Sequence, residues 1–289
     1  MRVVSLLPAA TEIVAALGAG SYLVGVSHAC DYPPEVQGLP RVTRTLVDTT
    51  RPSQEIDRAV GAARRAGTAP ITVDVELVAR LRPDVIIGQS VCQVCAVGDA
   101  ELARLVATLM PTPWVVTLHA HTLADVLVDI RRVGDGVGLQ DEAEELVRGL
   151  EYRLRRLRID VQRAAPARRA RVLVMEWLEP PYVAGHWVPE LVDLAGGEAV
   201  AAVRGEPSHA EPWPQLAALA PDLVVIALCG FDVPRARTEF AAVADPVAQT
   251  LFRQPVAFLD GNAYTSRPGP RLVDAAALLV QLIARRGAA

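Results

Sequence analysis

The sequence lacks lysine entirely, since all 29 of its basic residues are arginine. This absence excludes reactions that need a lysine amine, including Schiff-base and pyridoxal-phosphate chemistry and phosphate transfer by a P-loop or kinase lysine. The motifs GxGxxG, GxxxxGK(S/T), GxSxG and HExxH are missing as well. No nucleophile, base and orienting group stand in a recognisable arrangement, so the sequence favours a binding protein over an enzyme.

An excess of positive charge and long apolar runs are absent too. The 29 basic and 33 acidic residues give a net charge of −4, which provides no basic face for nucleic acid. No stretch approaches the roughly 18 uncharged apolar residues that indicate a membrane-spanning helix. The chain passes from Met1-Arg2 directly into an apolar run, unlike a signal peptide. We therefore expect a cytoplasmic location for the chain as given, and a periplasmic or extracellular one only if a signal sequence was removed.

Short apolar runs alternate with helical patterns, which predicts an α/β fold with parallel sheets. Helix 11–17 is expected to start with Thr11 as its N-cap. A polar, Arg-rich segment over 46–71, helical at 55–66, has the composition of a surface excursion. Strands are expected at 3–7, 23–27, 85–88, 114–118, 171–175, 223–228 and 256–259.

The length of 289 residues suggests two domains of about 150 residues each. Residues 138–164 place apolar side chains on one stripe, with acidic residues first and arginines last, as suits a long helix. The pattern then restarts, because residues 171–176 resemble 2–7 and residues 219–226 resemble 81–87. We predict an N-terminal α/β lobe over 1–137, a bridging helix over 138–165 and a C-terminal α/β lobe over 166–289.

Cysteine, histidine and tryptophan gather after predicted strands, where ligands of open parallel sheets bind. All four cysteines, four of the five histidines and two of the four tryptophans lie there. This concentration predicts a ligand cleft between the lobes, lined by soft metal ligands and aromatic side chains. The residues that we single out are Gln89, Trp177, Tyr182, His186, Trp187, Tyr264 and Arg267, and, as candidate metal ligands, Cys92, Cys95, His119 and His121.

Each group has a second interpretation. Cys92-x-x-Cys95, expected to be reduced, fits a ligand or metal contact, a redox pair or a structural pair, and no second CxxC completes a four-cysteine zinc site. His119-x-His121 puts two imidazoles on one side of an extended segment, which suits a metal but equally fits a solvated loop. Arg267 either pairs with an anionic ligand group or caps the helix that follows. The aromatic residues also fit ordinary packing within a lobe.

Four segments resemble a known family. Residues 2–13 and the motif Cys30-Asp-Tyr-Pro-Pro34 resemble the start of class III periplasmic binding proteins, the substrate-binding components of importers for cobalamin, haem and ferric siderophores. Residues 176–190 and 260–270 resemble the cobalamin-binding branch, also called BtuF type. The resemblance covers nearly the whole chain except the excursion at 46–71. It implies two Rossmann-like lobes bridged by a rigid helix, a corrinoid in the cleft and an ABC permease as partner.

The resemblance also implies roles for single residues. Aromatic walls suit a corrin, whose faces are broad and apolar while its amide rim needs few fixed hydrogen bonds. The residues carried over are Tyr32, Tyr182 and Trp213 as aromatic walls, Ala9 and Ala10 as backbone contacts, and Arg267 as a polar contact.

We therefore predict a non-catalytic protein that holds a corrinoid such as cobalamin for uptake, storage or delivery. Two alternatives stay open. In the first, the cleft binds haem, another metal chelate or a bare transition metal through Cys92, Cys95, His119 and His121. In the second, the chain is a thiol-redox or corrinoid-processing enzyme that uses Cys92 and Cys95.

Overall fold

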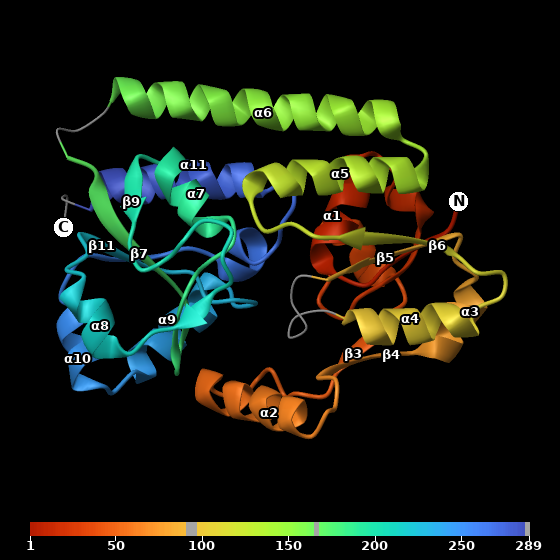
Figure 1. Cartoon of the computed structure of the whole chain (residues 1–289), viewed down its shortest axis with the longest axis horizontal. Helices are drawn as coiled ribbons and strands as arrows, with labels where there is room; N and C mark the ends of the chain where they lie inside the picture. Colours follow the sequence, from red (N-terminus) through yellow and green to blue (C-terminus); the bar gives the residue numbers. More distant parts are fainter. Residues whose placement is uncertain (91–96, 165–167, 287–289) are drawn as a thin grey trace. The chain divides into compact units, whose positions relative to one another are not determined.

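The structure is a computed structural model that describes residues 1–90, 97–164 and 168–286 (Figure 1). The chain folds into two compact units. The first lobe comprises residues 1–51, 58–120 and 124–149, and the second lobe comprises residues 52–57, 121–123 and 150 onward. Each lobe is α/β, as the alternation of apolar runs predicts. Within the described residues, no helix combines the length and the apolarity needed to cross a membrane.

The first lobe is built on a four-stranded parallel sheet with the order β2-β1-β5-β6. Strands of an all-parallel sheet are covered on both faces and are therefore apolar along their whole length. The fully buried strand Val-Ile-Ile-Gly-Gln is the clearest case. The strands are β1 (Val3–Ser5), β2 (Leu23–Val26), β5 (Val85–Gln89) and β6 (Trp114–Leu118).

Helices cover both faces of this sheet (Figure 1). On one face Ile86 packs in a buried cluster with Val78 and Leu105. On the other face a helix approaches β6 so closely that a Cβ atom at Gly136 would overlap with the side chain of Val116. The helices are α1 (Pro8–Ala16), α3 (Val75–Leu81), α4 (Asp99–Thr108) and α5 (Leu123–Val137), with short turns η1 (Gly20–Tyr22) and η2 (Pro34–Gly38).

The start of α1 differs from the prediction. The helix begins at Pro8, with Leu7 as its N-cap, and not at Thr11. Proline suits the first helical position because the N–H that it lacks would have no intrahelical acceptor there. Thr11 is instead buried, and its hydroxyl lies 2.8 Å from Ser5 Oγ and 3.1 Å from Cys30 Sγ.

The Arg-rich excursion is a helix closed by a two-stranded ribbon. Strands β3 (Thr43–Thr45) and β4 (Ile71–Val73) pair antiparallel and enclose α2 (Ser53–Arg65), so the predicted helix is confirmed. The first turn of α2 belongs to the second lobe, where the Ser53 N–H donates a 2.9 Å hydrogen bond to the buried Glu239 carboxylate.

The predicted long helix is α6 (Gln140–Arg163), 24 residues in length. Its acidic residues lie in the first turn and Arg163 in the last, which suits the helix dipole. The division between the two lobes falls inside this helix, between Gly149 and Leu150.

The second lobe holds a six-stranded mixed sheet. The three predicted strands, β7, β11 and β12, run parallel as expected. Three further strands were not predicted: β9 runs parallel to β7, and β8 and β10 run antiparallel. The reason is local: a two-residue connection, Glu179-Pro180, joins β7 to β8, and so short a connection can only join antiparallel strands. The strands are β7 (Ala170–Leu178), β8 (Pro181–Val183), β9 (Gly197–Ala199), β10 (His209–Ala210), β11 (Leu223–Ile226) and β12 (Val256–Phe258).

Two groups of helices pack on this second sheet (Figure 1). The first contains α7 (Val188–Leu194) and α11 (Leu272–Arg285). The second contains α8 (Trp213–Ala218), α9 (Val233–Ala242) and α10 (Pro246–Leu251). One turn of π-helix, η3 (Gly261–Thr265), follows β12.

A Pro-Asp pair locks the amino-terminal edge of the first sheet. Asp84 precedes β5 and accepts a 2.7 Å hydrogen bond from the Arg2 N–H, while the Asp84 N–H donates to the Arg2 carbonyl at 2.8 Å. The Arg2 Nε donates to the Leu81 carbonyl at 2.7 Å. Between them, Arg82 has a left-handed backbone with φ 44°.

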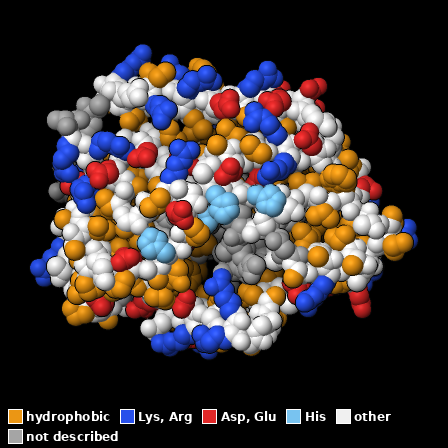
Figure 2. All heavy atoms as spheres, viewed as in Figure 1, with side chains coloured by type: hydrophobic (Ala, Val, Ile, Leu, Met, Phe, Trp, Pro, Cys, Tyr) orange, Lys and Arg blue, Asp and Glu red, His pale blue; other side chains and the backbone are white. Residues whose placement is uncertain are grey.

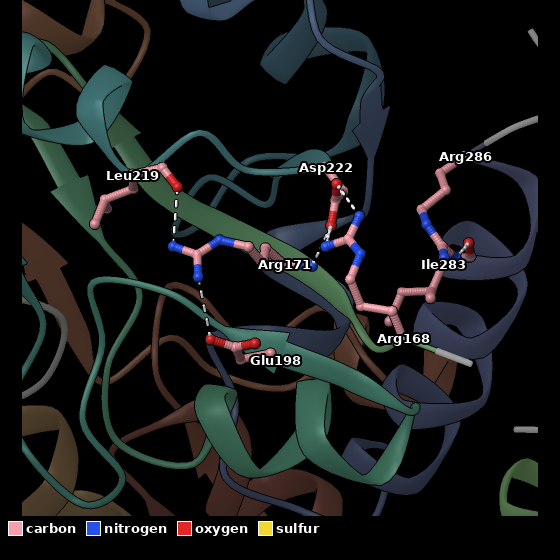
Figure 3. Close-up of polar contacts among 7 residues, drawn as sticks. All are labelled: Arg168, Arg171, Glu198, Leu219, Asp222, Ile283 and Arg286. Atoms are coloured by element: carbon pink, nitrogen blue, oxygen red, sulfur yellow. Dashed lines mark hydrogen bonds and ion pairs between the residues drawn. The ribbon is translucent and has the colours of Figure 1, made fainter. Parts of the chain in front are cut away.

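The second lobe repeats this lock contact by contact (Figure 3). Asp222 accepts from the Arg171 N–H at 2.8 Å and donates to the Arg171 carbonyl at 2.8 Å, and the Arg171 guanidinium reaches the Leu219 carbonyl at 2.9 Å. Ala220 is left-handed with φ 45°. Arg168 adds a bidentate pair to Asp222, with both distances 2.8 Å. The repeat predicted from the sequence is therefore confirmed, and we call each of these contact sets a Pro-Asp lock.

Candidate functional site

The carboxyl ends of the second-lobe strands meet around an aromatic cluster. Trp177 on β7 is paired in register with Tyr182 on β8. The Trp177 ring lies 5.2 Å from the ring of Phe231, which follows β11. The Cys229 N–H donates to the Glu176 carbonyl at 2.9 Å and fixes this loop against β7. Two of the predicted residues, Trp177 and Tyr182, thus lie together.

A second set of contacts joins the segment after β12 to this aromatic cluster. The Trp187 indole N–H donates a 2.9 Å hydrogen bond to the Thr265 carbonyl, and the Asn262 N–H donates to the Phe231 carbonyl at 3.1 Å. Asp260 caps η3 through the Ala263 N–H at 2.7 Å. We call the connected residues Trp177, Tyr182, His186, Trp187, Phe231, Tyr264 and Thr265 the second-lobe rim.

Three polar atoms of this rim are buried without a hydrogen-bond partner among the described residues: Trp177 Nε1, His186 Nδ1 and Thr265 Oγ1. Most buried polar groups in proteins are satisfied, and each one left unpaired costs about 1–3 kcal/mol. Such atoms are expected where a bound molecule completes the hydrogen bonding. The rim therefore combines aromatic surface with polar atoms ready for a ligand.

His186 is held in an unusual backbone conformation. Its φ is 53°, which non-glycine residues rarely adopt. The His186 N–H donates to the Glu206 carbonyl at 2.7 Å, and the ring stacks on Trp187 at 5.5 Å. Burial, and secondarily the neighbouring His121, lower the pKa of His186 below its usual value near 6.5. The imidazole is therefore neutral at neutral pH.

Tyr264 and Arg267 lie in and just after η3. The Arg271 guanidinium is 5.7 Å from the centre of the Tyr264 ring. Arg267 is buried, and its Nη2 donates to Asn262 Oδ1 at 2.7 Å. Helix α11 has Arg271 as its N-cap, without a side-chain cap.

Trp213 lies elsewhere in the second lobe. Its ring packs edge-on against Phe252 at 5.5 Å, within an aromatic core that includes Phe240 and Phe258. Only 7% of Trp213 is exposed. The contact is packing within the lobe, and a ligand role for Trp213 stays a prediction.

In the first lobe the predicted residues follow β1, β2 and β5. Ala9 and Ala10 are buried in the first turn of α1, where backbone N–H groups have no intrahelical acceptor, and their contact with a ligand stays a prediction. Tyr32 is 44% exposed and precedes Pro33. Gln89 is buried at the end of β5.

Sequence reasoning missed Asp129, which organises the loop after β6. This buried carboxylate accepts hydrogen bonds from the N–H groups of His119 and Ala120 at 2.8 and 2.9 Å, and from Arg132 at 2.7 Å. Burial raises the pKa of Asp129 despite these donors. Its sequence signal is an acid on the apolar stripe of α5, three residues before Arg132. The rim residues Phe231 and Thr265 were also missed, although both follow predicted strands.

A surface pocket of about 510 Å³ lies beside β6 and α5 in the first lobe. Trp114, Thr117, His119, Arg132 and Asp135 contribute to its walls. Among the predicted ligand or metal residues that the structure describes, only His119 lines it.

The predicted metal ligands divide into three groups. Cys92 and Cys95 lie outside the described residues. His119 belongs to the first lobe, where its Nδ1 contacts Ser90 Oγ, and His121 belongs to the second. Within the described ranges, no three or more His, Cys, Asp or Glu residues form a group that could hold a metal ion. The four-residue metal set stays a prediction.

On the face shown in Figure 2, arginine and acidic side chains are interspersed with apolar ones, in keeping with the modest net charge of −4.

Comparison with known proteins gives both sequence and structural likenesses. The vitamin B12-binding protein of Vibrio cholerae serotype O1 is 25% identical over 223 residues, which are 74% of this chain and 64% of that protein's length. The crystal structure of periplasmic vitamin B12-binding protein BtuF of Vibrio cholerae matches with a TM-score of 0.71 at 22% identity, covering 99% of this chain and 97% of that one. The periplasmic heme-binding protein RhuT from Roseiflexus sp. RS-1, in apo form, matches with a TM-score of 0.70 at 22% identity, covering 99% and 98%.

The chain thus spans somewhat less than two thirds of the curated relative it matches. At these identities the structural likeness shows the fold, which is two-lobed α/β. The sequence profile described as periplasmic binding protein matches residues 3–257. This match covers most of the chain, and the protein belongs to the periplasmic binding protein family.

Proposed function

We propose that this protein binds a corrinoid such as cobalamin, for uptake, storage or delivery, and that it performs no chemistry on it. The observation that carries the proposal is the second-lobe rim, where aromatic faces surround buried polar atoms without partners. The vitamin B12-binding relative supports the same ligand class.

The chemistry of the rim suits a corrinoid in two ways. The rings of Trp177 and Tyr182 offer broad apolar contact to the face of a macrocycle. The unpartnered groups are an indole N–H, a hydroxyl and a neutral imidazole, all uncharged at neutral pH. Uncharged donors match the carboxamide groups that surround a corrin ring. In the first lobe, Tyr32 offers a second exposed aromatic face.

The test is an absorbance titration of the reduced, purified protein with aquocobalamin, read together with tryptophan fluorescence. We expect saturation at one equivalent with quenching, because two of the four tryptophans belong to the rim. A shift of the corrin absorbance band would indicate that the protein also ligates cobalt. Saturation with an unshifted band would indicate that the corrinoid binds without cobalt ligation by the protein. Absence of binding at micromolar concentrations would overturn the proposal.

Tyr32→Ala and Tyr182→Ala should each weaken corrinoid binding about tenfold, the equivalent of about 1–1.5 kcal/mol of lost aromatic contact. The matched control is Tyr152→Ala, since Tyr152 is 61% exposed on α6. Equal affinity of the two site variants and the control would remove these residues from the site.

A parallel titration with haem separates the two tetrapyrrole classes. The heme-binding structural relative makes haem the natural competitor. If haem binds more tightly than aquocobalamin, haem becomes the proposed ligand and the binding role is kept. If the corrinoid binds, transfer to an ABC permease is the next step to assay.

A further inference from the structure

Two histidines from distant parts of the sequence face each other in the second lobe. The ring centres of His121 and His186 are 5.4 Å apart, and the ring planes are tilted by 47°. His121 lies in the short segment between β6 and α5, and His186 lies between β8 and α7. The chain has five histidines, and two of them form this pair.

The segment that contains His121 is anchored by the carboxylate of Glu190. The Leu123 N–H donates a 2.8 Å hydrogen bond to Glu190 Oε2, and the other carboxylate oxygen of Glu190 pairs with Arg204 at 2.7 Å. The Glu190 side chain is only 11% exposed. This carboxylate therefore holds residues 121–123 in place within the second lobe.

His186 is fixed from both sides of its backbone. Its N–H donates to the Glu206 carbonyl, and its carbonyl accepts from the Gly205 N–H at 2.9 Å. These bonds hold the left-handed conformation, which costs of the order of 1–3 kcal/mol for a non-glycine residue. The neighbouring Trp187 ring supports the imidazole, and Trp187 is itself tied to Thr265. Strain maintained in this way is typical of functional positions.

The hydrogen bonding of His186 is incomplete. Nδ1 is buried and has no hydrogen-bond partner in the part of the chain that the structure describes. This nitrogen belongs to the ring whose centre lies 5.4 Å from that of His121. A neutral imidazole keeps a lone pair, which is what a metal ion requires of a histidine ligand.

We propose that His121 and His186 form a two-imidazole site for a borderline transition-metal ion such as Zn²⁺, Co²⁺ or Cu²⁺. The ring separation fits this assignment. With metal–nitrogen bonds of about 2.1 Å, an ion lies about 3.2 Å from each ring centre. Two ring centres 5.4 Å apart then subtend about 115° at the ion, near the tetrahedral angle.

The site is of the open kind. No third His, Cys, Asp or Glu joins the pair within the described residues. Two of four tetrahedral positions are then left for water or another small donor, as in zinc sites that exchange ligands rather than in closed structural sites. Imidazole is a ligand that zinc, copper and cobalt all accept.

The proposal goes beyond corrinoid binding and does not depend on it. The axial positions of a metal in a planar macrocycle lie on opposite faces, about 180° apart. Two imidazoles at about 115° around an ion fit a free metal ion instead. Success or failure with corrinoids therefore leaves this site to be judged by its own measurement.

The experiment uses metal-free, reduced full-length protein in which Cys92 and Cys95 are both replaced by serine, so that thiolates contribute nothing. Zn²⁺ is titrated by calorimetry, and Cu²⁺ binding is followed by EPR. We expect one equivalent of Zn²⁺ to bind and the Cu²⁺ signal to show nitrogen coupling from two imidazoles. His121→Ala and His186→Asn should each weaken Zn²⁺ binding at least about tenfold, and each should leave coupling from one imidazole.

The variants are chosen to keep the fold. Asparagine tolerates the left-handed backbone at position 186, and His121 is exposed. The matched control is His209→Ala, an exposed histidine of the same lobe that is 3.8 Å from Glu211. Its Zn²⁺ affinity should equal that of the parent protein. Unchanged affinity in both pair variants, or no Zn²⁺ binding by the parent protein, would overturn the site.

Titrating the same variants with aquocobalamin separates the two proposals. Loss of Zn²⁺ binding in His121→Ala, a residue outside the second-lobe rim, with intact corrinoid binding supports the ion site as a separate feature. A corrin band shift that disappears in His186→Asn, without any Zn²⁺ binding by the parent, would assign His186 to the corrinoid cobalt and overturn the ion site.

Discussion

Replacing Gly261 with alanine should destabilise the protein by about 3 kcal/mol or more and abolish ligand binding at the second-lobe rim. Gly261 is the first residue of η3 and lies against the backbone that follows β11. A Cβ atom there would lie 2.6 Å from the carbonyl carbon of Leu228 and 2.7 Å from that of Ala227. These are backbone atoms, which cannot rotate away as a flexible side chain can.

The clash has a consequence for the rim as well as for stability. Any relief moves either the end of β11 or the η3 turn that presents Tyr264 and the Thr265 carbonyl. Moving η3 breaks the 2.9 Å hydrogen bond from the Trp187 indole to Thr265. The measurement is urea unfolding followed by circular dichroism, together with corrinoid titration.

Gly149→Ala is the matched control. Gly149 lies in the exposed interior of α6, and an added Cβ meets nothing within 4 Å. Alanine there should raise the free energy of unfolding by about 0.5–1 kcal/mol, because glycine is a poor helix former. A loss below 1 kcal/mol for Gly261→Ala would show that the crowding at β11 is relieved cheaply.

Removing the Asp222 carboxylate should produce the second large effect. Asp222→Ala is expected to lower the free energy of unfolding by about 2 kcal/mol. It deprives the Arg171 N–H of its acceptor and removes both bonds from Arg168, and the Asp222 side chain is only 25% exposed (Figure 3). Thermal and urea unfolding of the variant measure the loss.

The ionisation of Asp222 should also make the free energy of unfolding depend on pH. The hydrogen bond from Arg168, and secondarily that from the Arg171 N–H, lower the pKa of Asp222 below its ordinary value near 3.8. A lowered folded-state pKa means that the carboxylate stabilises the protein above that pH and that this contribution is lost as pH falls through the folded pKa. Asp222→Asn should therefore flatten the loss of stability below about pH 4.

The first-lobe lock supplies the comparison. The Asp84 carboxylate accepts a hydrogen bond from the Arg2 N–H, but Asp84 is more exposed than Asp222. No counterpart of the Arg168 pair is seen among the described contacts. Asp84→Ala should therefore cost less than Asp222→Ala. An equal or greater cost would mean that the arginine pair contributes nothing to the second lock.

Strand positions could be predicted because buried parallel strands are short apolar runs with polar residues at their ends. Residues 114–118 were predicted and found as a strand without change. The repeat was visible because the same Pro-Asp pair precedes β5 and β11. The start of α1 was misjudged because Thr11 has the composition of a cap, whereas its hydroxyl is used by Ser5 and Cys30, contacts that no local pattern reveals.

The candidate site could be predicted only in part, for a similar reason. The rule that ligands bind beyond strand ends selected Trp177, Tyr182 and Trp187; Trp177 is paired with Tyr182, and Trp187 is hydrogen-bonded to Thr265 after β12. It could not show that Trp213 belongs to an aromatic core or that His121 faces His186. Those facts depend on how helices pack and on where a loop is anchored, at sequence separations that carry no periodic signal.

The two Pro-Asp locks have a practical consequence for protein engineering. Each lock ties together the strands of its own sheet at the amino-terminal edge, while Trp177, Phe231 and Thr265 lie at or beyond the carboxyl ends of β7, β11 and β12. The loops after β7, β11 and β12 can therefore be exchanged or randomised without touching either lock. A library built in those loops would retain both locks, provided that Gly261, where a side chain would meet the backbone of Ala227 and Leu228, is kept.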